Sequence, residues 1–250
     1  MKKINREIPV LMYHQFVKES KDTKIETYVT EKQFEKHLKI LKFLGYETIT
    51  FRDLNKIGLE NRFHKKYIII TVDDGYKNNC EIMFPLLKKY NMKAVIYLVS
   101  DLKYNKWDVD KYGEEKLELM NDYEIKEMIN SGLIEFGGHT MHHVSFYETN
   151  LEEIKKEIIE NKEKLENKYN IKLTSFAYPY GHITEESKKI VKECGYTFAV
   201  STDTGTGIIE NDLYDIRRTA IDKTSILNFL RKISQKYSIY KGKKWEKNIV

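Results

Sequence analysis

The stretch that most constrains the fold is residues 67–72, Tyr-Ile-Ile-Ile-Thr-Val, which is apolar and β-branched almost throughout. A strand of this composition, without polar alternation, is typical of a parallel sheet whose faces are covered by helices. The run ends in Asp73, Asp74 and Gly75. Because active sites in α/β folds lie at the carboxyl ends of the strands, these residues mark a candidate site as well as a fold class.

The adjacent carboxylates of Asp73 and Asp74 repel each other, since neighbouring Cα atoms are only about 3.8 Å apart. Successive side chains of a regular strand point to opposite faces, so two Asp that share one site must lie where the strand ends and the chain bends. Gly75 permits such a bend. We therefore expect different tasks for the two residues, one binding a cation and the other acting as a base. The alternative is a helix N-cap with a solvated neighbour.

Strand and helix patterns alternate about seven times along the chain. This alternation predicts a parallel sheet with helices outside, and the number of repeats favours a closed or nearly closed barrel over an open sheet. Strands are expected at residues 8–13, 47–50, 67–72, 93–99, 133–136, 173–177, 197–201 and 214–221, and helices at 31–44, 51–59, 79–90, 122–131, 151–169, 184–193 and 225–236.

Capping patterns and breaks in periodicity organise the segments between the strands. A capping box that begins at Thr30 opens the first helix, and Asn150 is the expected N-cap of the longest one. Residues 15–29 are expected to form a polar loop. Residues 101–119 are charged and aromatic, with Trp107 in the middle, and are expected to be an inserted loop and a candidate for substrate contact.

The composition is that of one large globular domain. Of the 250 residues 41% are hydrophobic, which is enough for a sizeable core, and only 3 prolines and 12 glycines are present, which argues against a long linker. We therefore expect a single domain over residues 1–250. Its catalytic core is expected at 8–221, followed by a C-terminal helix and charged tail at 222–250.

The charge pattern gives no sign of a nucleic-acid partner. The net charge of +5 arises from 43 basic and 38 acidic residues that are interspersed along the chain, without the basic stripe of a nucleic-acid binder. No apolar run reaches the length of about 18 residues that a membrane span needs. We expect neither a nucleic-acid partner nor a membrane span.

Two further features bear on the compartment. Cys80 and Cys194 lie far apart and belong to no Cys-x-x-Cys motif, which predicts two reduced thiols. Residues 1–7 carry no apolar segment after their charges, so no signal peptide is expected. The chain as written is expected to be cytoplasmic, or extracellular or at the cell surface if a signal segment has been removed from it.

Four polar clusters each follow an expected strand directly. They are His14, the Asp73–Asp74 pair, residues 139–143 and residues 178–181. The carboxyl ends of the strands of a β/α barrel meet at one mouth, so we expect these clusters to form a single site.

The segment His-Thr-Met-His-His at 139–143 has the spacing of a metal site. On a helical turn His139 and His143 would face the same side, and with Asp74 they form a set of two His and one carboxylate that leaves a coordination position open for water. His142 is an alternative partner, although as the neighbour of His143 it should point elsewhere. The other interpretation is a loop with hydrogen-bonded surface histidines.

This arrangement predicts metal-assisted hydrolysis. The cation would polarise a carbonyl group and a water molecule, and Asp73 would take the proton of the water. A backbone N–H would stabilise the oxyanion, and a separate acid would protonate the leaving nitrogen. His14 is the candidate acid because histidine titrates near neutral pH, the alternative being a hydrogen-bonded histidine at a strand end.

Three motifs in order resemble those of the polysaccharide deacetylase family, which is carbohydrate esterase family 4 with its chitooligosaccharide deacetylase homology domain. They are Thr-Val-Asp-Asp-Gly at 71–75, His-Thr-x-x-His at 139–143 and Phe-Ala-Tyr-Pro-Tyr-Gly at 176–181. The resemblance covers about residues 8–221. It implies a distorted (β/α)₇ barrel that hydrolyses the N-acetyl group of sugars of the N-acetylglucosamine type.

The resemblance also implies roles for individual residues. Asp73 resembles the family's base, and Asp74, His139 and His143 resemble its metal ligands. Tyr180 resembles the residue whose backbone N–H helps to hold the oxyanion. The substrate-binding residues that the third motif implies are Tyr178, Pro179, Tyr180 and Gly181. The expected cofactor is one divalent ion, with zinc as the first candidate and cobalt or nickel as ions that fit the same ligands.

The N-terminal run Pro-Val-Leu-Met-Tyr-His at 9–14 is similar to the branch that contains poly-β-1,6-N-acetylglucosamine deacetylases. In that branch a histidine motif stands at the N-terminus, in a permuted order, and supplies the acid. This similarity supports His14 as the acid.

The chain departs from the family pattern in three places. Ala177 stands where the third motif often has the Arg that orients the base, so Arg218, or failing that Arg217, is expected to replace it from another strand. Residues 202–205, Thr-Asp-Thr-Gly, stand in place of the usual Asp-Trp, and no C-terminal Leu-x-x-His is present. These departures concern the sugar specificity more than the chemistry.

The primary hypothesis is a metal-dependent deacetylase acting on an N-acetylated glycan or amino sugar. A glycosidase that uses Asp73 and Asp74 as its pair is the first alternative, but adjacent Asp fit poorly because a retaining pair needs about 5 Å between its carboxyl groups across the sugar. A non-catalytic carbohydrate-binding relative and a deacetylase of a small intracellular N-acetylated substrate are the others.

Overall fold

The structure is a computed structural model that describes residues 7–20, 27–223 and 225–249. Residues 1–6, on which the expectation about a signal peptide rests, lie outside the described residues, as do residues 21–26 of the expected loop. Within the part of the chain that is described, no helix is both long and apolar enough to cross a membrane.

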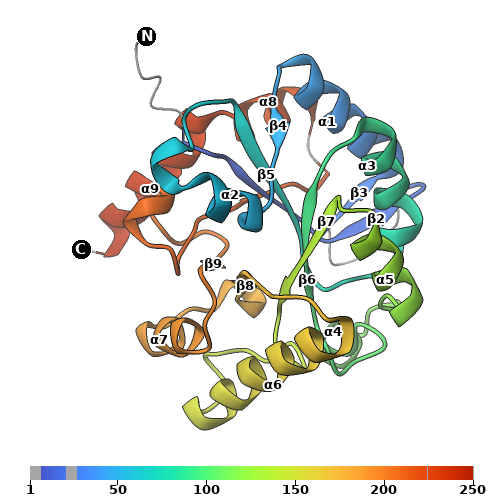
Figure 1. Cartoon of the computed structure of the whole chain (residues 1–250), viewed down its shortest axis with the longest axis vertical. Coiled ribbons are helices and arrows are strands. Elements are labelled where there is room, and N and C mark those ends of the chain that lie inside the picture. Colours follow the sequence, from blue (N-terminus) through green and yellow to red (C-terminus); the bar gives the residue numbers. More distant parts are fainter. Residues whose placement is uncertain (1–6, 21–26, 224, 250) are drawn as a thin grey trace.

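A curled parallel sheet forms the centre of the molecule, with helices around it (Figure 1). Its strands follow the order β10-β1-β5-β6-β7-β8-β9, and β4 pairs with the start of β5. The predicted (β/α)₇ barrel is therefore confirmed as the fold class. The strands are β1 (Val10–Tyr13), β4 (Glu47–Thr48), β5 (Tyr67–Val72), β6 (Ala94–Leu98), β7 (Ile134–Gly138), β8 (Ser175–Ala177), β9 (Phe198–Val200) and β10 (Thr219–Ala220).

The segment around β10 brings the two edges of the sheet together. Ile216 forms a parallel bridge with Val200 at the end of β9, and the Arg218 N–H donates to Thr202 O at 3.3 Å. Three residues later the Ile221 N–H donates to Met12 O of β1 at 2.8 Å. A single stretch of chain thus pairs first with one edge strand and then with the other, which nearly closes the barrel.

Helices cover the outside of the curled sheet, and their starts follow the capping rules. Thr30, Thr50, Asn121 and Thr184 each make a reciprocal capping box, and Asn150 caps α6, so the starts predicted at Thr30 and Asn150 are confirmed. The helices are α1 (Glu31–Phe43), α2 (Phe51–Ile57), α3 (Phe84–Tyr90), α4 (Lys106–Tyr112), α5 (Asp122–Asn130), α6 (Leu151–Tyr169), α7 (Glu185–Glu193), α8 (Ile226–Lys232) and α9 (Gln235–Ile249).

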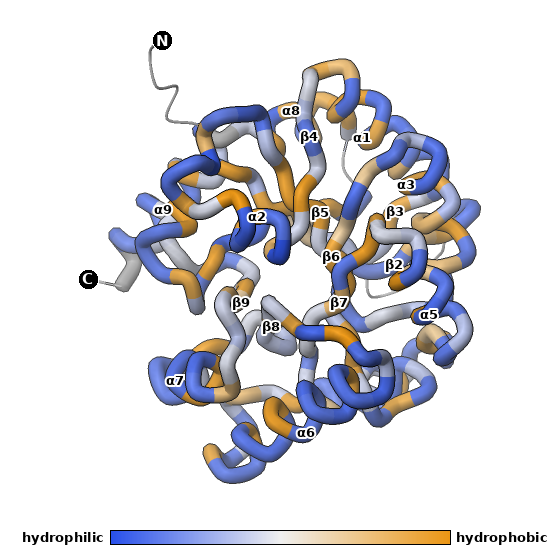
Figure 2. The backbone as a smooth tube through the Cα atoms, viewed as in Figure 1, coloured by the Kyte–Doolittle hydropathy of each residue, from blue (hydrophilic) through white to orange (hydrophobic). Residues whose placement is uncertain are grey.

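The alternation of side chains along β5 explains why the strand is apolar on both faces. Ile68 and Ile70 pack in the core beneath the helices, whereas Tyr67 and Ile69 pack inside the barrel. Figure 2 shows the contrast between the hydrophobic stretch around β5 and the mostly hydrophilic outer turns of α6 and α7. Thr71 continues the inward face of the strand, so the next inward position falls on the first residue beyond it, Asp73.

Two predicted loops contain regular structure. Residues 15–29 include β2 (Gln15–Val17) and β3 (Tyr28–Thr30), which pair as a separate two-stranded sheet. The insertion at 101–119 contains α4. The loop predictions were wrong because these elements are too short for a periodic pattern, and burial of residues such as Phe16 and Trp107 stabilises them.

Other boundaries also differ from the expectations. The helix predicted at 79–90 begins as a π-turn (Asn79–Met83) before α3. The helix predicted at 225–236 is divided into α8 and α9, and α9 is helical where a charged tail was expected. The single domain and its division at residue 221 stay predictions.

Candidate active site

A tight turn at the end of β5 separates the two neighbouring carboxylates. The Gly75 N–H donates to Asp73 O at 2.9 Å, and Asp74 between them has a φ of 74°, which defines a γ-turn of the rare left-handed type. Gly75 follows with a φ of 76°. A non-glycine residue in this conformation costs about 1–3 kcal/mol, a strain that is concentrated at functional sites. The bend thus begins at Asp74 itself and directs the two carboxylates to different partners.

Asp73 is buried and forms a bidentate ion pair with Arg218, with N–O distances of 2.6 and 2.7 Å. The guanidinium group also donates to Ser201 O at 2.7 Å and to Thr71 Oγ1 at 3.1 Å, so its position is fixed inside the barrel. Burial would raise the pKa of Asp73, but the charge and hydrogen bonds of Arg218 outweigh burial and lower the pKa to about 2. Asp73 is therefore ionised and rigidly oriented at neutral pH.

Of the two arginines that the sequence offered as replacements, Arg218 is the one that contacts Asp73. Arg217, one residue earlier on the chain, points the other way and donates through Nε to Gly205 O at 2.9 Å. The alternation of neighbouring side chains along an extended segment separates the two.

Asp74, His139 and His143 come together as a buried group, called here the Asp-His-His set. Asp74 Oδ1 lies 3.4 Å from Nε2 of each histidine, and one ligand atom from each residue lies within 4.8 Å of the others. Asp74 Oδ1 is buried and has no hydrogen-bond partner among the described residues. An unpartnered buried carboxylate oxygen is costly, and a cation would satisfy it. The donor set therefore fits a divalent metal.

Both histidines present Nε2 to Asp74, the orientation that a shared metal ion requires. His139 Nδ1 lies 2.7 Å from Ala177 O, and this bond places the proton on Nδ1 and leaves Nε2 free to face Asp74. Burial lowers the pKa of His143 to about 3, against the opposing charge of Asp74, so that its ring is neutral at physiological pH.

The histidines meet through an irregular loop and not through the predicted helical turn. Thr140 and His143 have φ values of 64° and 58°, both left-handed, and no helix covers residues 139–143. The loop is held from α6, where Asn161 Nδ2 donates to Thr140 O at 2.6 Å and Glu157 accepts from the Met141 N–H at 2.8 Å. The helical-turn prediction was wrong because these side chains stabilise a different backbone.

Glu157 and Asn161 position the loop of the two candidate histidine ligands, and no sequence expectation named them. They are four residues apart on the inner face of α6, and both are buried among apolar positions of the same helix. Polar residues that interrupt an apolar stripe are the signal that could have identified them. Glu157 also binds His142 Nδ1 at 2.6 Å, and His142 Nε2 lies 3.3 Å from Asp101, so His142 points away from the Asp-His-His set as expected.

The inserted helix α4 packs against the Asp-His-His set. The ring of Trp107 stacks on His143 with a centroid distance of 4.3 Å and an interplanar angle of 27°. His143 Nδ1 is buried without a hydrogen-bond partner among the described residues, so aromatic contacts hold this ring where a hydrogen bond usually would. The next residue, Asp108, accepts from Tyr76 Oη at 3.0 Å and ties α4 to the γ-turn. No sequence pattern marked Asp108.

His14 lies beside Asp73, directly after β1. Its Nε2 is 3.8 Å from Asp73 Oδ2, which is too long for a hydrogen bond but close enough for both groups to reach one substrate. The side chain is 22% exposed, whereas Asp73 is buried. Asn79 Nδ2 donates to His14 O at 2.8 Å and fixes the backbone at this position.

Residues 178–181 contribute unequally to the site. Tyr178 is buried and donates to Tyr214 O at 3.0 Å, so its side chain belongs to the core. Pro179 is also buried. Gly181 has a φ of 68°, and a Cβ there would meet the Thr202 side chain. Tyr180, with a φ of 58°, is the member whose ring faces His143, at a centroid distance of 4.6 Å.

Comparisons with known proteins show which family and which relatives this chain resembles. Residues 60–199 match the sequence profile of the family described as polysaccharide deacetylase. YxkH of Bacillus subtilis (strain 168) is 28% identical over 215 residues, which are 86% of this chain and 71% of that protein. The poly-β-1,6-N-acetyl-D-glucosamine N-deacetylase of Staphylococcus aureus (strain MRSA252) is 24% identical over 222 residues, which are 85% and 74% of the two chains.

Among solved structures, the deacetylase PplD of Streptococcus pyogenes has a similar fold. The TM-score is 0.78 at 23% sequence identity, and the match covers 91% of this chain and 98% of that one. The likeness therefore extends over nearly the whole of both chains.

Proposed function

Because the chain belongs to the polysaccharide deacetylase family, we propose that it is a metal-dependent hydrolase that removes N-acetyl groups from a glycan built of N-acetylglucosamine. The main observation behind the proposal is that two adjacent aspartates contact different groups. Asp73 is oriented as an ionised carboxylate by Arg218 and does not face the candidate ligands, so it can act as a base, whereas Asp74 faces two histidines.

We infer the class of sugar from one related protein and from the position of His14. The Staphylococcus aureus relative is named for deacetylation of poly-β-1,6-N-acetyl-D-glucosamine, and its similarity extends over 85% of this chain. His14 lies beside Asp73, where the resemblance to that branch expects the acid. Both observations favour a glycan substrate over a small N-acetylated molecule.

Asp74, His139 and His143 would hold one divalent cation, and zinc is the ion that we propose because two His and one carboxylate are typical of catalytic zinc. Cobalt and nickel accept the same ligands. When bound, such an ion supplies Lewis acidity toward a carbonyl oxygen and lowers the pKa of water.

The chain's own residues divide the remaining steps. Asp73 accepts a proton from water as the water oxygen bonds to the acetyl carbon. The backbone N–H of Tyr180 donates to the resulting oxyanion. The carbon–nitrogen bond then breaks while His14 Nε2 gives a proton to the sugar nitrogen, and the products are acetate and a free amino sugar. Arg218 keeps Asp73 oriented throughout, because both carboxylate oxygens are bonded to it.

The rival functions find less support. A glycosidase needs one protonated carboxylic acid opposite one carboxylate. Here the pKa values of both Asp73 and Asp74 lie below their ordinary value, since Arg218 and the histidines outweigh the effect of burial. A non-catalytic relative would be expected to have a broken ligand set, whereas all three members are present and buried.

Acetate release from N-acetylglucosamine oligomers, both β-1,4 and β-1,6 linked, tests the proposal. The purified chain is assayed as isolated, after EDTA treatment, and after addition of zinc, cobalt or nickel, while bound metal is measured in parallel. We expect EDTA to abolish acetate release and a metal to restore it.

Bound metal without acetate from either linkage would contradict the glycan substrate and favour a smaller one. Failure to bind any metal would contradict hydrolysis altogether. Asp74→Asn, in which one ligand is lost at constant size, is the matched control for metal that binds elsewhere on the protein.

A further inference from the structure

A row of aromatic rings leads from the Asp-His-His set to the protein surface. The ring of Tyr180 lies 4.6 Å from His143, and the ring of His182 lies 5.5 Å from Tyr180. Tyr147 then stacks on His182 with a centroid distance of 4.2 Å and an interplanar angle of 14°. The row begins at a buried metal-ligand candidate and ends at a side chain that is 62% exposed.

The outer pair of this row, Tyr147 and His182, is fixed by contacts on two loops. His182 Nδ1 is 2.8 Å from Ser145 Oγ, and Ser145 is buried. Tyr147 Oη donates to Ile183 O at 3.4 Å. Because His182 covers one face of the Tyr147 ring and the side chain is largely exposed, the other face remains open to a ligand.

Polar groups lie beside the row. Lys111 Nζ, from the last turn of α4, is 5.4 Å from the centroid of the Tyr180 ring and 3.8 Å from Glu148 Oε1. The open face of the Tyr147 ring, with the charged groups of Lys111 and Glu148 nearby along the row, suits a molecule that has apolar faces and a polar rim. A sugar ring has this form, because its C–H groups lie on its faces and its hydroxyl groups on its edge.

We propose that Tyr147 and His182 form a binding subsite for a second sugar of the glycan, farther along the chain than the residue that loses its acetyl group. This proposal rests on the proposed function and specifies its substrate as an extended chain. The subsite is continuous with the reaction centre through Tyr180, so a glycan bound there positions another acetamido group near Asp73. Binding energy from the second sugar would then contribute to the reaction at the first.

The test compares substrates of increasing length. Acetate release is measured for the N-acetylglucosamine monomer, trimer and hexamer with the metal-loaded wild type, Tyr147→Ala and Tyr147→Trp. We expect the wild type to prefer the hexamer, and Tyr147→Ala to lose about three- to tenfold in kcat/KM for the hexamer relative to the monomer, mainly through KM. Tyr147→Trp, which keeps a stacking surface, should restore most of the preference.

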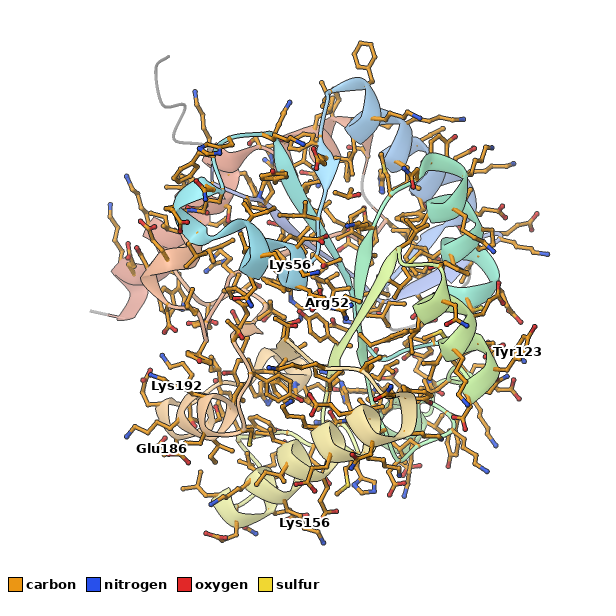
Figure 3. The ribbon with its side chains drawn as sticks, viewed as in Figure 1. Arg52, Lys56, Tyr123, Lys156, Glu186 and Lys192 are labelled. Carbon is orange, nitrogen blue, oxygen red and sulfur yellow. The ribbon has the colours of Figure 1, made fainter. Side chains whose placement is uncertain are left out.

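Tyr240→Ala is the matched control, because Tyr240 is a similarly exposed tyrosine on α9, 65% accessible. Tyr123 of α5, labelled in Figure 3, is less suitable because it lines a cavity that Asp74 also borders. Tyr240→Ala should leave the length preference unchanged. An equal loss for monomer and hexamer in Tyr147→Ala, or the same loss in Tyr240→Ala, would overturn the subsite.

A binding measurement separates the failure of the subsite from the failure of the proposed function. Calorimetry of the hexamer with Asp73→Asn requires no turnover, and Tyr147→Ala in that background should weaken binding by the same three- to tenfold. Weakened binding without acetate release by the wild type would support the subsite and contradict the deacetylase. Acetate release with unweakened binding would support the deacetylase and contradict the subsite.

Discussion

At the scale of single residues, Asp73 and Asp74 are of the same type, and it is the groups they contact that decide the role each can have. Asp73 and Asp74 are neighbours in the chain and both are buried. Arg218 donates hydrogen bonds to both carboxylate oxygens of Asp73, while Asp74 presents an oxygen without a hydrogen-bond partner to two histidines. The γ-turn between them makes this separation possible.

The first prediction concerns this pair. Asp73→Asn should keep metal affinity but lower acetate release by about 100-fold or more, the effect of losing a general base. Asp74→Asn should lose metal affinity, because it removes the only carboxylate of the Asp-His-His set. Metal titration by calorimetry and an acetate assay on the same preparations check both. Loss of metal in Asp73→Asn and retention in Asp74→Asn would reverse the assignment.

The second prediction concerns the ion pair between Asp73 and Arg218. Arg218→Met should destabilise the protein by about 3–5 kcal/mol, because it leaves Asp73 as a buried charge without its counter-ion. The double variant Asp73→Asn/Arg218→Met removes that charge as well and should recover much of the stability. Urea unfolding of the wild type, both single variants and the double variant measures the coupling. Additive losses would show that the two groups do not depend on each other.

At the scale of elements, helix α4 adds contacts to this site that the strand ends of the barrel do not provide. It was hidden in an insertion without periodicity, and it brings Trp107 onto His143 and Asp108 onto Tyr76. Both contacts join residues that are far apart in the sequence, so no local sequence pattern could predict them.

The third prediction follows from the stacked ring. Trp107→Ala should weaken zinc binding by about 10- to 100-fold, the usual effect of removing the partner of a ligating histidine, and Trp107→Phe should retain most of the affinity. Zinc calorimetry measures both. The chain's second tryptophan provides the control, since Trp245 lies on α9 and its replacement by Ala should leave affinity unchanged. Equal affinity in Trp107→Ala and the wild type would exclude a positioning role.

The strands and helices also show how much of the fold the sequence could predict. The apolar run at 67–72 and the caps at Thr30 and Asn150 are strong local signals, and they gave the sheet and the helix starts correctly. The ends of the strands then located the candidate ligands. Local sequence patterns could not predict the backbone conformation of residues 139–143. Its left-handed residues are stabilised by Asn161 and Glu157 from a helix that is distant in the sequence.

At the scale of the whole molecule, one buried histidine joins three parts of the fold. His37 of α1 is 2% exposed, lies 3.2 Å from Tyr13 Oη of β1 and stacks on Phe229 of α8 at 3.9 Å. Burial, and secondarily the charge of Lys232, lowers the pKa of His37 from 6.5 to about 4. The ring is therefore neutral in the folded protein at physiological pH.

The fourth prediction is a pH dependence of stability. The folded protein resists protonation of His37 and the unfolded chain does not, so the stabilisation is fully present above pH 6.5 and is lost as the pH falls toward 4. The lowered pKa corresponds to about 3 kcal/mol across this range. His37→Gln should show a flatter profile between pH 6.5 and 4. Urea unfolding at several pH values measures the difference, and parallel profiles would contradict the assignment.

The closing segment around β10 has a consequence for the order in which the protein is made. Asp73 and Arg218 are 145 residues apart in the chain, and Arg218 lies on the stretch that pairs with both edges of the sheet. A ribosome therefore completes Asp73, the candidate ligands and most of the barrel well before it supplies Arg218, the ion-pair partner of Asp73. The nascent protein cannot assemble this centre until synthesis has passed residue 218, so activity and completion of the barrel arrive together.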